Sequence, residues 1–174
     1  MLGLMQDFPL LVHRVLDHAA RWHGDTEVLS RSVEGPLHRI PYREVNRRAR
    51  ALASAARTRL GVAPGTVIAT MAWNTWRHLE TWYGIMGVQG IVHTLNPRLF
   101  NEQLTYIINH AGDQWIFTDL TFVPLFEKLQ PVDAHDVQDD RVVAPGAQQV
   151  EAGLVIRGAV EHQAFVILEN LLQR

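Results

Sequence analysis

The first part of the chain alternates between two patterns of apolar residues. Apolar side chains recur every three or four positions from Leu10 to Trp22 and again from Tyr42 to Leu60, the spacing of one helical face. Between these stretches lie two short β-like runs, Glu27 to Val33 and Leu37 to Ile40, separated by the turn sequence Glu34-Gly35-Pro36. The pattern therefore predicts a helix, a hairpin and a second helix.

Three units of strand, polar joint and amphipathic helix follow. Thr66 to Ala72 is an almost continuous apolar run, short enough for a strand covered on both faces. Further strands are expected from Ile91 to Leu95 and from Trp115 to Thr118, the last followed by a short helix from Leu120 to Leu129. Such a series predicts an α/β fold with a partial, doubly wound parallel sheet.

The helix after the second of these strands carries signals at both ends. Asn101 is expected to cap its start, and Glu102 suits the positive end of the helix dipole. His110 and Gly112 stand where the helix finishes.

Residues 131–174 lose this regularity. The stretches Asp133 to Asp140 and Pro145 to Gln149 are typical of linkers, and only Ala159 to Leu172 recovers helical spacing. We therefore expect residues 1–130 to belong to one domain, and residues 131–174 to form an irregular, linker-like tail that is partly helical or disordered.

Composition narrows the class of protein. The chain has 174 residues, 47% of them hydrophobic and 20% charged, enough apolar material for one globular core. A formal net charge of −2 provides no basic field for nucleic acid, and the absence of cysteine excludes disulfides. The start lacks the basic and apolar regions of a signal peptide, and no stretch is apolar enough to span a membrane. We therefore expect a soluble, cytoplasmic protein.

Three polar residues follow the three predicted parallel strands. Asn74, Asn96 and Asp119 stand at the carboxyl ends, where ligands of open α/β sheets bind, so they are candidate substrate-binding residues. Asn and Asp are also the residues preferred for capping helices and starting turns, and this second interpretation is favoured.

Other polar clusters favour structural roles. Gly84, Gly87 and Gly90 lie within and just after a predicted helix, which favours close packing of that helix on the sheet over a phosphate cradle. The nine histidines include no pair at i and i+4, so no metal site is expected. The arginines at 43, 47, 48 and 50 are expected to form a solvated helix face rather than an anion site.

Two absences exclude common enzyme classes. Lys128 is the only lysine and lies outside any glycine-rich loop, so a Walker-type phosphate loop is excluded. The chain has no Gly-x-Ser-x-Gly elbow, the central element of an α/β-hydrolase.

Three segments together resemble a known family. They are "LLVHRVLDHAARWHGDTEVLSR" at Leu10 to Arg31, "IPYREVNRRARALA" at Ile40 to Ala53, and the run from Gly61 to Asp119. In this order they resemble the amino-terminal part of fatty-acyl-CoA synthetases of the adenylate-forming superfamily. Tyr42 to Val45 is similar to that superfamily's first core motif, and Gly87 to Arg98 to its second.

The segment "HTLNPR" at His93 to Arg98 is the most specific part of this resemblance and points to the branch acting on medium- and long-chain fatty acids. The resemblance spans residues 7 to 130. It implies that full-length members activate a fatty acid with ATP and Mg²⁺ to an acyl-adenylate, and then transfer the acyl group to coenzyme A. It also implies homodimers in full-length members, to which this region would contribute.

The chain departs from the family in what it lacks. The family's Ser/Thr/Gly-rich loop ending in Pro-Lys-Gly and its carboxy-terminal lysine are absent, so we expect no catalytic residue here and no strong binding of ATP, Mg²⁺ or coenzyme A. The tail after Pro131 does not resemble the family's continuation, which indicates a truncated, frame-shifted or otherwise altered product. The sequence thus predicts an inactive fragment of a fatty-acid:CoA ligase. The alternative is a noncatalytic α/β interaction module that docks a partner or a full-length synthetase.

Overall fold

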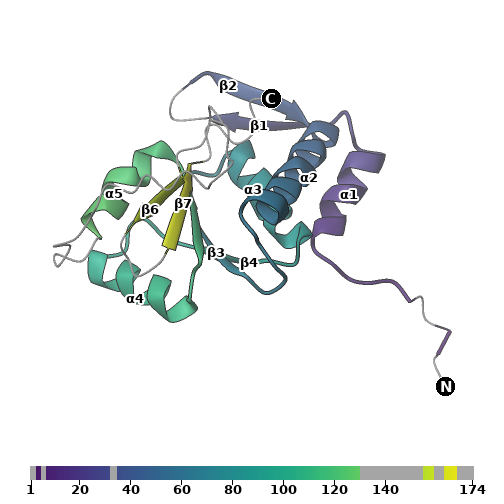
Figure 1. Ribbon diagram of the computed structural model, residues 1–174. Coiled ribbons are helices and arrows are strands. Elements are labelled where there is room, and N and C mark those ends of the chain that lie inside the picture. Colours follow the sequence, from purple (N-terminus) through teal and green to yellow (C-terminus); the bar gives the residue numbers. More distant parts are fainter. Residues whose placement is uncertain (1–2, 5–6, 32–34, 130–154, 159–162, 168–174) are drawn as a thin grey trace.

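The computed structural model describes residues 3–4, 7–31, 35–129, 155–158 and 163–167. Within these ranges a mixed five-stranded sheet is flanked by helices, and a separate hairpin lies beside them (Figure 1). None of the helices in these ranges is long and apolar enough to cross a membrane.

The amino-terminal elements pack around a small core of their own. Helix α1 (His13–Trp22) packs beside helix α2 (Tyr42–Arg59), and strands β1 (Glu27–Arg31) and β2 (Leu37–Pro41) form an antiparallel hairpin (Figure 1). All four elements occur where the sequence predicts them. Their shared core consists of four buried apolar residues, Leu16, Ile40, Val45 and Ala49.

The main sheet has the strand order β4-β3-β5-β7-β6. Strand β3 (Val67–Met71) lies between β4 (Ile91–Thr94) and β5 (Trp115–Thr118) and is parallel to both, which confirms the predicted parallel sheet. Strand β7 (Gln163–Ile167) extends it in parallel next to β5, and β6 (Val155–Gly158) closes the order in the antiparallel direction.

Helices cover both faces of this sheet. Helices α2 and α3 (Trp76–Gly87) pack on the face that carries Ile68, while α4 (Asn101–Ala111) and α5 (Val123–Lys128) pack on the face that carries Ala69. Successive side chains of a strand point to opposite faces, so one short apolar strand fills two cores. The doubly wound arrangement is thereby confirmed. The 3-10 turn η1 (Leu120–Phe122) links β5 to α5.

Helix α4 begins differently from the prediction. Phe100, not Asn101, occupies the N-cap position, and its backbone N–H donates to Gln103 Oε1 at 3.2 Å. Asn101 is already the first helical residue, so the predicted cap is wrong by one position. The predicted end is confirmed, because Gly112 adopts a left-handed φ of 66° that favours glycine.

The expectations for the tail fall mostly outside the described residues. The predicted linkers at 133–140 and 145–149 and most of Ala159 to Leu172 lie there. Within the described part of the tail, the expected helix is wrong at Gln163–Ile167, which forms β7. The free edge of β5 offers backbone groups to a strand, and this long-range pairing outweighs local helical spacing.

Within the glycine series, Gly84 packs its helix tightly on another helix rather than on the sheet. A Cβ added at Gly84 would lie 2.7 Å from Leu52 Cδ2 and 2.9 Å from Ala49 O, both on α2. Close packing was predicted correctly, but its partner is α2. Because Gly84 brings α3 against α2, it also sets the position of the first turns of α3, which border the candidate site.

Candidate functional site

A cavity of about 700 Å³ lies at the carboxyl ends of β3 and β4. Its walls come from the hairpin, from the joints after the two strands and from the beginning of α3. The lining residues are 28–30 of β1, 72–75 after β3, 94–98 at the end of β4 and in the loop beyond it, and His78, Leu79 and Trp82 of α3. This is the edge of an open α/β sheet where ligands bind.

The structure brings two of the three predicted site residues to this cavity. Asn74 and Asn96 both line it, because β3 and β4 are neighbours in the sheet and end together. Asn96 Oδ1 also accepts a hydrogen bond from the Arg98 backbone N–H at 3.0 Å, the contact of a turn-forming residue. Asn96 therefore shapes the loop and faces the cavity at the same time, and its role in binding stays a prediction.

Asp119 does not line the cavity. Its side chain is buried, and Oδ2 accepts a hydrogen bond from the Trp73 backbone N–H at 2.8 Å. The rings of Trp73 and Phe122 lie 5.1 Å apart, between their centroids, in the same region. The joint after β5 is thus tied to the joint after β3 by a hydrogen bond and a ring contact.

Three residues missed by the sequence analysis contribute to the cavity. His78 Nε2 lies 3.1 Å from Thr70 Oγ1, and burial lowers the pKa of His78, which keeps the ring neutral near pH 7. Trp73 and Trp82 both line the cavity, and each is 40% exposed.

The six residues of the family-specific motif are divided between two environments. His93 Nδ1 lies 2.7 Å from Asp113 Oδ2, and His93 stands in register with Ala69, whose face packs on α4. Burial raises the pKa of Asp113, while His93 opposes that shift. Asn96 and Arg98 line the cavity instead. His93 thus belongs to the α4 side of the sheet, and Asn96 and Arg98 belong to the edge that carries the cavity.

The arginines of α2 are engaged by carboxylates, as expected for a helix face rather than an anion site. Arg43 pairs with Asp25, Arg47 with Glu44 and Arg50 with Asp17, all at the surface. Arg48 differs from the predicted solvated face, because its Nε donates at 2.7 Å to Glu80 Oε1, whose side chain is fully buried.

The described residues do not fit a nucleoside triphosphate with its metal ion. Gly84 packs against α2 instead of presenting its backbone amide in a loop, and Lys128 is exposed at the end of α5. In the described part of the chain, no three His, Asp or Glu side chains lie close enough together to hold a metal ion. Phosphate binding needs convergent amides and cations, and among the described residues that line the cavity Arg98 is the only arginine or lysine.

Sequence comparisons identify relatives over most of the chain. Residues 16–166 match the family described as AMP-binding enzyme. The chain is 43% identical over 166 residues to 3-methylmercaptopropionyl-CoA ligase from Ruegeria pomeroyi, covering 95% of this chain and 30% of that protein. It is 45% identical over 129 residues to medium-chain-fatty-acid–CoA ligase from Ectopseudomonas oleovorans, covering 74% of this chain and 23% of that protein. The chain therefore spans less than a third of the length of these curated relatives.

The family match extends beyond residue 130, where the sequence analysis ended the resemblance. Among solved structures, the N-terminal domain of FACL13 from Mycobacterium tuberculosis superposes with a TM-score of 0.62 at 19% identity, covering 69% of this chain and 30% of that one. This similarity establishes the fold. Because the family model matches continuously from α1 into β7, the chain belongs to the AMP-binding enzyme family.

Proposed function

We propose that this chain is the amino-terminal portion of an ATP-dependent acid:CoA ligase whose substrate is a fatty acid, and that the chain alone does not form an acyl-adenylate. The observation that carries the proposal is 43% identity in continuous order to a CoA ligase over 95% of the chain. In this role, β3 to β5 and their helices supply a packed scaffold. The groups that bind phosphates and stabilise the charge of the adenylation transition state lie in other parts of the enzyme.

Exchange of pyrophosphate into ATP tests the second half of the proposal. The purified 174-residue chain, supplied with octanoate, ATP and Mg²⁺, should give no exchange above a protein-free control. Lys128 is the only lysine and no Pro-Lys-Gly loop is present, so the family's lysine contact with the phosphates is missing from this chain. Exchange clearly above the control would contradict this half alone.

A chimera tests the first half. Residues 1–130 of this chain replace the aligned part of the Ruegeria pomeroyi ligase, and acyl-CoA formation is measured with 3-methylmercaptopropionate and with octanoate. The proposal predicts an active chimera, because the scaffold is interchangeable between members of one family. A folded chimera that forms neither thioester would contradict it.

A second chimera addresses the domain boundary and carries all 174 residues in place of the aligned part. If residues 131–174 act as a linker-like tail although the family match extends to residue 166, this chimera should be much less active than the first. Equal activity of the two chimeras would contradict a boundary at residue 130. Homodimers of the active chimera, measured by light scattering, would support the prediction that this region contributes to an oligomer.

A further inference from the structure

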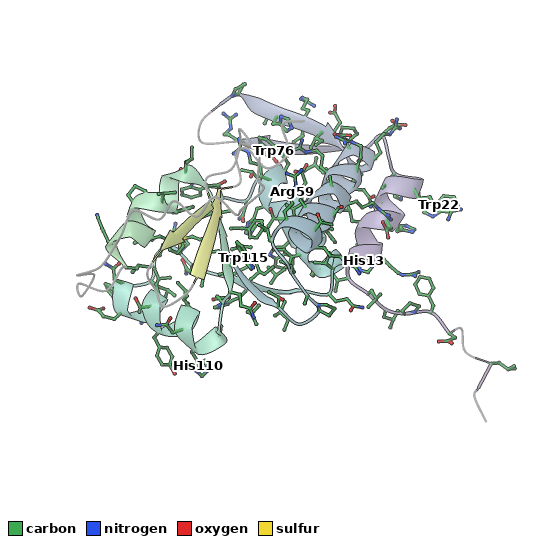
Figure 2. The ribbon with its side chains drawn as sticks, in the orientation of Figure 1. His13, Trp22, Arg59, Trp76, His110 and Trp115 are labelled. Atoms are coloured by element: carbon green, nitrogen blue, oxygen red, sulfur yellow. The ribbon has the colours of Figure 1, made fainter. Side chains whose placement is uncertain are left out.

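Helix α1 turns apolar side chains toward the solvent. Val15 and Trp22 are 60% and 66% exposed, and they share one face of the helix because seven residues make about two turns. Trp22 projects from α1 away from the body of the protein (Figure 2). Leu16 is the buried residue of this helix and lies in the small core shared with α2 and β2. One side of α1 therefore holds it to the protein, and its outer face remains exposed.

The chain before α1 adds further apolar groups to this region. Residues 7–12 lead away from the body of the protein (Figure 1) and are all exposed, Leu10 at 94%, and Asp7 is the only charged residue among them. Of the fifteen large apolar side chains that are exposed in the described ranges, seven lie between Leu4 and Trp22. A concentration of exposed apolar groups is typical of a surface that docks against a partner or a membrane.

An aromatic ring and an arginine lie together at each end of this region. The guanidinium of Arg14 lies over the ring of Phe8, 4.4 Å from the ring centroid, and the guanidinium of Arg21 lies over the ring of Trp22 at 5.4 Å. Both arginines are exposed. This pairing suits a membrane interface, because an aromatic ring can enter the headgroup region while the arginine beside it reaches the lipid phosphates.

The carboxylate of α1 does not cancel this positive charge. Asp17 is the only acidic residue of the helix, and it accepts hydrogen bonds from Asn46 and Arg50 of α2. Neither Arg14 nor Arg21 forms an ion pair within the part of the chain that the structure describes. Two copies of α1 packed face to face would bring arginines together without a counter-charge, whereas an anionic lipid surface supplies one for each arginine.

We propose that residues 7–22 form a docking surface for a bilayer that contains anionic phospholipid. Val15 and Trp22 enter the headgroup region together with the apolar residues before the helix, and Arg14 and Arg21 contact lipid phosphates. With ten residues α1 is too short to span the hydrocarbon core, so it lies on the bilayer. The docking surface goes beyond the proposed function, and each proposal can fail without the other.

Sedimentation of the 174-residue chain with phospholipid vesicles tests the docking surface. Saturable binding is expected for vesicles made of phosphatidylglycerol and phosphatidylcholine, with much weaker binding for phosphatidylcholine alone and weaker binding at high salt. Tryptophan fluorescence should shift to shorter wavelength on binding, as Trp22 leaves water. Trp22→Phe should remove most of this shift and retain binding.

A double variant separates the charged contacts from the apolar ones. Each arginine near an anionic surface is worth about fivefold in binding, so Arg14→Gln/Arg21→Gln should bind the anionic vesicles roughly twentyfold more weakly. Its weak binding to phosphatidylcholine should not change. Arg59→Gln/Arg98→Gln removes the same charge from the end of α2 and from the loop after β4, so it is the matched control and should alter binding little.

The apolar contacts have a matched pair of their own. Val15→Ser/Trp22→Ser should weaken binding roughly tenfold or more, because it removes apolar area that enters the lipid. Tyr106→Ser on α4 is the control, since Tyr106 is 65% exposed and lies outside the docking surface, and it should bind vesicles as the original chain does. Thermal unfolding of each variant checks that it is folded.

Three results would overturn the proposal. The first is no binding of the folded chain to the anionic vesicles, and the second is an equal loss of binding in the two double arginine variants. The third is a dimer in the absence of lipid that Val15→Ser/Trp22→Ser converts to a monomer, because a second copy would then cover this surface. None of them involves pyrophosphate exchange or thioester formation, so the activity of the chimeras is a separate result.

Discussion

Arg48 on α2 donates a hydrogen bond to Glu80 on α3 at 2.7 Å, and this pair joins two helices through a carboxyl group with no exposed surface. Burial raises the pKa of Glu80 to about 7, and the hydrogen bond from Arg48 opposes the shift. Glu80 Oε2 has no hydrogen-bond partner among the described residues. The stability of the fold should therefore depend both on whether Glu80 is protonated and on whether Arg48 is present.

The stability of the fold should depend on pH through Glu80. Its pKa is about 7 in the folded chain and near the ordinary 4.5 in the unfolded chain, so the folded state retains the proton across that window. The contribution of Glu80 to the free energy of unfolding should be highest below its unfolded pKa of 4.5, fall by about 2 kcal/mol between pH 5 and 7, and level off about one pH unit above the folded pKa. Urea denaturation at several pH values measures the slope.

Two variants isolate this effect. Glu80→Gln keeps an acceptor for Arg48 but removes the titrating group, so it should flatten the slope between pH 5 and 7. Glu44→Gln removes a carboxyl from the surface pair with Arg47 and should preserve the slope. An unchanged slope in Glu80→Gln would show that other groups cause the pH dependence.

Removal of Arg48 should be costly, and more so at high pH. Arg48→Met leaves an ionised carboxylate buried without its partner at pH 8, which we expect to cost about 3 kcal/mol of unfolding free energy. At pH 5 the cost should be smaller, since Glu80 is then neutral. Arg47→Met, one position earlier and exposed, should change stability little at either pH. Equal losses for the two arginines would contradict the buried pair.

Gly84→Ala should destabilise the contact between α3 and α2. The added Cβ would lie 2.9 Å from the backbone oxygen of Ala49, which moves only if a helix moves. We expect a loss of about 1–3 kcal/mol, measured by urea denaturation. Gly87→Ala is the control within the same helix, since its nearest neighbour would be Ala53 Cβ at 4.0 Å. Alanine is the better helix former, so this variant should be neutral or slightly stabilised, and parallel losses would refute the packing role.

Variants of Asp119 and Asn96 separate the roles of the predicted site residues. Asp119→Ala leaves the Trp73 backbone N–H without its buried acceptor and should cost about 2 kcal/mol. Asp119→Asn retains an acceptor and should lose much less. Asn96→Ala removes only an exposed turn contact, so its effect on stability should be small. Greater destabilisation by Asn96→Ala than by Asp119→Ala would reverse these roles.

Local sequence patterns were sufficient to predict those helices and strands whose formation depends on their own residues. The stripe from Tyr42 to Leu60 predicted α2 to within one residue, and the apolar run Trp115 to Thr118 predicted β5 with its exact bounds. The turn Glu34-Gly35-Pro36 predicted the hairpin for the same reason. Helical spacing, strand alternation and turn chemistry act over a few neighbouring residues, so they can be predicted from a single sequence.

The site depended on contacts between distant segments. Asn74, Asn96 and Asp119 are equivalent in sequence, since each follows a parallel strand. In the structure, Asn74 and Asn96 line the cavity beside β1 and α3, whereas the side chain of Asp119 is buried and accepts a hydrogen bond from the Trp73 backbone. Similarly, Glu80 lies on a predicted amphipathic helix, and its burial beside Arg48 follows from packing against α2.

The sequence by itself therefore determined the elements, the doubly wound class and the family. Tertiary structure alone decided which polar residues share a cavity, which are buried in pairs, and that Gln163–Ile167 forms a strand next to β5. The reason is physical: a residue's local preferences amount to a few tenths of a kcal/mol up to about 1 kcal/mol, whereas burial, desolvation of charge and strand pairing depend on partners that are far away in the chain.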